Sequence, residues 1–202
     1  MADFTQAAVA DAIAHAENTH PWSSLGSSIP PTEGALWALI TMHHAYVEVA
    51  TPTNPPSFYI QVNLGTTDES WPTVAQFTPT SAAVVVENLT ATEPIAETVM
   101  TVVSTTGFAA GDYLYIDDVG TPANSEWHQV RQLDSVGTDI TLTAGLVTAK
   151  DTSDNIYSQA ETFTMTLDLS GVAAWRVIYL NEGGTSVDSA IWVRYIEVTD
   201  IA

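Results

Sequence analysis

The clearest indication of the fold is the sequence WRVIYL (residues 175–180), which is followed by NEGG (181–184) and then by IWVRYIEV (191–198). β-Branched and aromatic residues dominate both apolar runs, as is typical of strands, and the segment between them has the composition of a turn. These residues predict a strand, a glycine turn with a loop, and a returning strand.

More strands are expected on the N-terminal side of this stretch. Outward and inward residues alternate from Ala35 to Val49, and a second strand covers residues 58–64 before Gly65. A short β-branched run follows at 82–86, and alternation returns at 163–169. Several strands separated by Thr, Gly and Pro turns, with no second helical pattern after the N-terminus, predict an antiparallel β-sandwich.

The middle of the chain has its own pattern of short strands. They are expected at residues 98–103, 113–116, 126–133 and 140–143, with turns at 107–112 and at Gly137. We interpret them as a small β-barrel or roll at residues 98–159, inserted into one sandwich formed by 35–97 plus 160–202. The alternative is two sequential β domains.

Residues 1–34 differ from the rest of the chain. Apolar residues recur at helical spacing after Asp3, which can cap a helix of about 14 residues ending near Asn18. A Pro- and Ser-rich connection then runs to Pro31. The segment is interpreted either as a helix packed on its own domain or as an arm on a neighbouring subunit. The residues expected to make the contacts of such an arm are Phe4, Val9, Ile13 and Trp22.

Charge excludes several classes of partner. The 202 residues contain 24 Asp and Glu against four Lys and Arg, so the net charge is −20. Nucleic acids and anionic membranes require basic residues to neutralise phosphate, so neither is expected to bind. No apolar run is long enough to span a membrane and no signal-peptide pattern is visible, which predicts synthesis in the cytoplasm. Cysteine is absent, which excludes disulfides and thiolate chemistry.

One stretch carries a resemblance to a known group of proteins. GFAAGDY (107–113), then Glu126 with Val130, then TLTAGL (141–146) are similar to a β module of virion proteins from tailed viruses, found in tail components and capsid-associated proteins. The two glycines of the first motif permit a tight turn over the aromatic residue. The surrounding strands are similar in pattern to jelly-roll or carbohydrate-binding-module-like domains of virions.

The resemblance implies a structural virion protein and transfers no catalytic residue. It implies a capsid decoration, or cementing, protein that contacts the major capsid protein and forms homo-oligomers, with trimers expected by analogy. A tail or baseplate component is the alternative within the same class. A carbohydrate-binding receptor module is the alternative from another class.

Few residues form a pattern typical of a catalytic or metal-binding site. Adjacent His43 and His44 point to opposite faces of a strand, so they do not share a metal ion, and no metalloprotease, serine-hydrolase or phosphate-loop motif is present. The best candidates for a cation are Asp151 and Asp154, whose loop oxygens suit Ca²⁺, although solvated loop acids are the alternative. We therefore expect no enzymatic activity and no cofactor other than this calcium ion. Most Trp residues are expected in the core, and Trp71 is the one expected at the surface.

Overall fold

The computed structural model describes residues 4–10, 23–24, 28–47, 55–65, 71–80, 85–180 and 189–199. The described residues contain only β-strands and one 3-10 turn, Pro122–Asn124. No helix in these ranges is long and apolar enough to cross a membrane. The strands are β1 Phe4–Ala10, β2 Ser23–Ser24, β3 Trp37–Tyr46, β4 Ser57–Asn63, β5 Thr73–Phe77, β6 Val86–Asn88, β7 Val99–Thr101, β8 Tyr113–Asp117, β9 Glu126–Leu133, β10 Asp139–Leu142, β11 Asn155–Ser158, β12 Glu161–Asp168, β13 Ala174–Leu180 and β14 Ser189–Val198.

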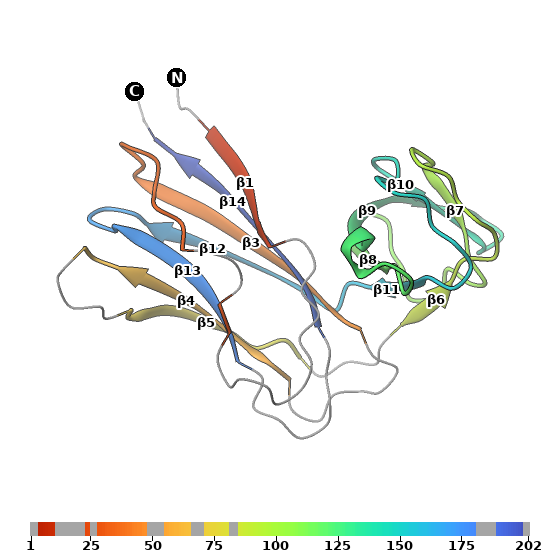
Figure 1. Ribbon diagram of the computed structural model, residues 1–202, viewed down its shortest axis with the longest axis horizontal. Coiled ribbons are helices and arrows are strands. Elements are labelled where there is room, and N and C mark those ends of the chain that lie inside the picture. The colour runs from red at the N-terminus through yellow and green to blue at the C-terminus, as the bar shows by residue number, and fades with distance from the viewer. Residues whose placement is uncertain are drawn as a thin grey trace.

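Two four-stranded antiparallel sheets face each other as a sandwich (Figure 1). The first has the order β1-β14-β3-β12 and the second the order β2-β13-β4-β5. Their facing side chains form one apolar core, in which Ile40, Trp175 and Val177 are fully buried. The alternation predicted from the sequence thus places one face of β3, β4, β12 and β14 in the core.

A six-stranded antiparallel sheet, order β6-β11-β8-β9-β10-β7, forms a second body that curls on itself (Figure 1). We call it the module. It has a separate core that includes Met100, Leu114 and Ile140. Gly107 and Gly111 adopt φ values of +91° and +96°, which a side chain would disfavour, and Phe108 between them is buried in that core. The turn predicted at 107–112 is therefore present.

The N-terminal helix predicted from the sequence is wrong for residues 4–10. These residues form strand β1, which pairs with β14 from Phe4 opposite Val198 to Ala10 opposite Val193. An alanine-rich segment tolerates either conformation, whereas an unpaired β14 would leave a row of backbone donors and acceptors without partners. The rest of the predicted helix, up to Asn18, lies outside the described residues.

The returning strand predicted from the opening stretch is present, but it does not return beside its predecessor. β13 pairs with β4 in one sheet, and β14 pairs with β3 in the other. The connection between them therefore crosses from one layer of the sandwich to the other. The jelly-roll connectivity and the domain limits expected from the sequence stay predictions.

Candidate functional site

The module meets the outer face of the first sheet at the ends of β3 and β14, and we call this contact the junction. Its buried residues are Ala45, Tyr115, Trp127, Tyr157 and Ala190. β3 shows the effect directly, because its exposure alternates up to Thr41 and both of its faces are buried from Met42 onward. The Arg194 guanidinium donates a hydrogen bond across the junction to the Tyr113 hydroxyl, at 3.0 Å.

His43 lies at the centre of the junction. Its ring centroid is 4.0 Å from that of Tyr113 and 5.5 Å from that of Trp192. Burial lowers the pKa of His43 to about 4, although a hydrogen bond with the Gln159 side chain raises it, and nearby Arg194 lowers it further. His43 is therefore neutral at physiological pH and acts as an aromatic packing residue.

His44 points to the opposite face of β3, as the sequence predicted. Its Nε2 lies 3.0 Å from the Ser189 hydroxyl, a pairing that sequence reasoning could not find because the residues come from distant strands. Burial lowers the pKa of His44 to about 3, and Ser189 has no exposed surface. A nucleophile needs access to its substrate, so we interpret His44 and buried Ser189 as a structural hydrogen-bonded pair.

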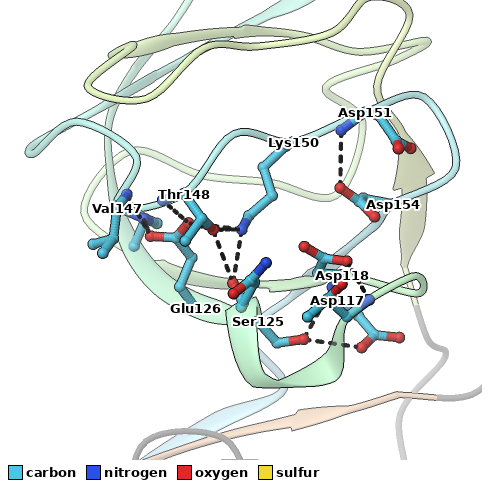
Figure 2. Close-up of polar contacts among 12 residues, drawn as sticks. Asp117, Asp118, Ser125, Glu126, Val147, Thr148, Lys150, Asp151 and Asp154 are labelled. Atoms are coloured by element: carbon cyan, nitrogen blue, oxygen red, sulfur yellow. Dashed lines mark hydrogen bonds and ion pairs between the residues drawn. The ribbon is translucent and has the colours of Figure 1, made fainter.

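The single lysine of the chain is buried in the module (Figure 2). Lys150 Nζ lies 2.9 Å from Glu126 Oε1, donates to the Asn124 carbonyl at 2.7 Å, and also donates to the Thr148 hydroxyl. Burial would raise the pKa of Glu126, but hydrogen bonds from His128, Lys150 and the Val147 amide outweigh it and lower the pKa to about 2. Because hydrogen-bond donors surround both carboxylate oxygens of Glu126, we interpret this cluster as a contact that stabilises the module.

The aspartates predicted to bind calcium lie on a loop beside this cluster (Figure 2). Asp154 accepts hydrogen bonds from the Asp151 amide at 2.9 Å and from the Val119 amide at 3.2 Å. Burial raises the pKa of Asp154, and the charges of Asp118 and Asp151 raise it further. Within the described ranges, no three His, Cys, Asp or Glu residues gather in a way that could hold a metal ion. Calcium binding at Asp151 and Asp154 therefore stays a prediction.

The residues predicted for an N-terminal arm are only partly placed. Phe4 and Val9 belong to β1, and the register between β1 and β14 shifts at Val9. Ile13 and Trp22 lie outside the described residues. Trp71, predicted at the surface, is half-buried, with the Arg176 guanidinium carbon 4.1 Å from its ring centroid.

The side of the sandwich formed by β12 and β5 carries an apolar groove. A cavity of about 450 Å³ lies there, with Leu64, Val74, Met165 and Val172 among its lining residues. Phe77 of β5 and Phe163 of β12 stack with ring centroids 4.9 Å apart, so the two edge strands are in contact there. Sequence patterning predicted the strands but could not show that they leave this side open.

Comparison with known proteins gives only weak similarities. No family model matches the chain, and no curated protein matches it. The VP2 subviral particle of infectious bursal disease virus is 11% identical to this chain. The match covers 98% of this chain and 42% of the VP2 chain, with a TM-score of 0.27. VP17, a capsid protein of bacteriophage P23-77, is 13% identical, with coverage of 98% and 99% and a TM-score of 0.17. The P23-77 complex of the two major capsid proteins VP16 and VP17 is 12% identical, with coverage of 96% and 98% and a TM-score of 0.17. These three neighbours are proteins of viral particles, and their TM-scores are too low to identify a fold shared with this chain.

Proposed function

We propose that this chain is a structural component of a virion, a capsid decoration protein that stabilises the particle through contacts with neighbouring subunits and has no catalytic activity. The observation that carries the proposal is the unprotected edge of β12 beside the apolar groove. The resemblance of residues 98–158 to a module of tailed-virus virion proteins supports it.

Strand β12 lacks most of the features by which edge strands normally avoid pairing, and its two charged residues, Glu161 and Asp168, stand only at its ends. Its eight residues, ETFTMTLD, contain no Pro, Gly or Lys, and the strand stays in register with β3 from Glu161 to Asp168 without a bulge. Among the described residues, no strand pairs with its other edge. Monomeric proteins protect such edges from pairing with another chain by bulges, prolines or charges. An edge without this protection along its length indicates a binding partner.

The charge distribution indicates what kind of partner covers this edge. Lys150 is buried on Glu126, while Arg176 and Arg194 lie over Trp rings and are half-buried, so Arg131 is the one exposed Lys or Arg among the described residues. Glu161 and Asp168 stand at the two ends of β12. We infer that the partner is a basic surface of another virion protein, such as the major capsid protein. Contacts between copies, including the trimer expected by analogy, would need salt to screen their repulsion.

A tail or baseplate component would use the same edge and groove, so the structure favours neither position in the particle. Purified chain mixed with particles that lack it, followed by co-sedimentation, tests the proposal. The variant Thr164→Lys/Thr166→Lys places two charges on the β12 edge strand and is expected to weaken binding about tenfold or more. Thr143→Lys/Ala144→Lys makes the same charge change at exposed positions of the module and should bind like the wild type.

The proposal fails if the wild-type chain does not co-sediment, or if the β12 variant binds as well as its control. A density map of the intact virion provides the second test, since it places the chain on the shell, in the tail or in neither.

A further inference from the structure

A concave corner lies where the module meets the outer face of the first sheet. On the paired strands β3 and β14, Thr41 lies opposite Arg194 and Leu39 lies opposite Ile196. Tyr113 of the module forms one side of the corner. These five residues are among those that line a cavity of about 170 Å³. All five side chains are only half-buried, so the corner is open to a ligand.

Arg194 is the only charged residue among those lining the corner, and no acidic side chain in the described part of the chain forms an ion pair with it. One of its NH groups donates to the Tyr113 hydroxyl, and its guanidinium carbon lies 4.6 Å from the Trp192 ring centroid. The ion pairs among the described residues are both on Glu126, although the chain has 24 acidic residues. A guanidinium has five N–H donors, and its fork matches a carboxylate with two parallel hydrogen bonds. Arg194 therefore retains donors for an external carboxylate.

The rest of the corner limits the ligand to a single negative charge on an amphipathic body. His43 beside Arg194 is neutral at physiological pH, so the corner supplies one positive charge, which suits a carboxylate better than a phosphate dianion. Leu39 and Ile196 offer apolar surface, and Tyr113 offers an aromatic ring. The Thr41 hydroxyl adds a hydrogen-bonding group. Sugar rings have both an apolar C–H surface and hydroxyl groups, and they pack on surfaces of this kind.

We propose that this corner binds the carboxylate of an acidic sugar, with Arg194 as the anion-binding residue. This binding function goes beyond the structural role proposed above and does not depend on it. The net charge of −20 repels anions at a distance, but screening at physiological salt limits that repulsion to about 8 Å. We expect a dissociation constant of about 1 mM for one site, which many copies on one surface would strengthen by avidity.

Isothermal titration of the full chain with N-acetylneuraminate and with glucuronate tests the proposal. Glucose and acetate are the ligand controls. Glucose has the sugar ring without a carboxylate, and acetate has the carboxylate without a sugar ring. Arg194→Gln should weaken binding about tenfold or more, whereas Arg131→Gln, the same charge change at an exposed arginine, should leave it unchanged. Thr41→Glu is the second variant, because it places a carboxylate opposite Arg194 and should block the site without removing the arginine.

Saturable binding of either acidic sugar that both corner variants lose supports the proposal. It is overturned if neither sugar binds up to about 20 mM, if acetate binds as well as the sugars, or if Arg194→Gln binds like the wild type. Sedimentation tests the other source of a carboxylate, which is an acidic side chain of a second copy of this chain. If the wild type self-associates and Arg194→Gln does not, the occupant is an acidic side chain of a second copy, and the sugar proposal is wrong.

Discussion

The sandwich and the module specify their structures in different ways. In the module, several polar contacts join residues that are close in the chain, as where partly exposed Asp134 accepts hydrogen bonds through Oδ1 from the amides of Gly137, Thr138 and Asp139. The sandwich instead joins distant segments, since β14 lies between β1 and β3. We infer that local polar contacts hold the module and that long-range strand pairing holds the sandwich. Hydrogen exchange measured separately on the two bodies can test this difference.

The largest effect is expected from Glu126→Ala, which leaves Lys150 buried without its carboxylate. Breaking a buried ion pair costs about 3–5 kcal/mol, so exchange protection should fall in β8 and β9 and much less in β3 and β14. Asp112→Ala removes an exposed carboxylate of the same module and should change little. Equal losses in the two bodies would show that they unfold as one unit.

Deleting residues 1–34 should act on the sandwich instead. The deletion removes β1 from β14, the 2.8 Å bond from the Ile29 amide to the Trp175 carbonyl, and the 3.0 Å bond from the Thr32 amide to buried Glu197. We expect a loss of about 2–3 kcal/mol in the protection of β14, with the module unchanged. Loss of particle binding with β14 still protected would instead show that the segment acts as an arm on a neighbouring subunit.

A smaller effect on the module is expected from Gly145→Ala. A Cβ at Gly145 would lie 2.5 Å from the Ala96 carbonyl oxygen, so the backbone would have to shift. Overpacking of this kind costs about 1–3 kcal/mol, which a urea titration of the module signals can measure. Gly120→Ala is the control, because the nearest atom to its Cβ would be 3.7 Å away. Equal midpoints for both variants would contradict the close packing of this turn.

The mildest test is a pH titration of the wild type. His43 and His44 have pKa values lowered from 6.5 to about 4 and about 3, so the unfolded chain takes up protons first and the sandwich loses stability as pH falls below about 6.5. Glu126 has its pKa lowered from 4.5 to about 2, so its contribution to the module is lost only between about pH 4.5 and 2. We expect exchange protection to fall in the sandwich at a higher pH than in the module. Coincident losses would remove this distinction.

Much of the strand pattern could be predicted from the sequence because alternation is a local property. The expected strand at 126–133 matches β9, and the run at 163–169 corresponds to β12. Residues 4–10 were misassigned because their alanines fit either period, and pairing with β14 decides between them. β5 and β11 were missed, since neither Thr73–Phe77 nor Asn155–Ser158 forms an extended apolar run.

The candidate sites were harder to predict because their residues meet only in the folded chain. Lys150 and Glu126 are far apart in the sequence, and nothing near Lys150 indicates a buried cation. The corner at Arg194 combines β3, β8 and β14, so no single motif contains it. The acidic loop of Asp151 and Asp154 was visible in the sequence because its residues are neighbours.

The pairing of β6 with β11 has a practical consequence. Asn88 lies opposite Asn155 and Val86 opposite Tyr157, so the chain leaves the sandwich and comes back to it at almost the same place. A foreign domain whose two ends lie close together could therefore be joined to the chain at these two strands. If the chain coats a particle, this is the position at which an engineer would display cargo.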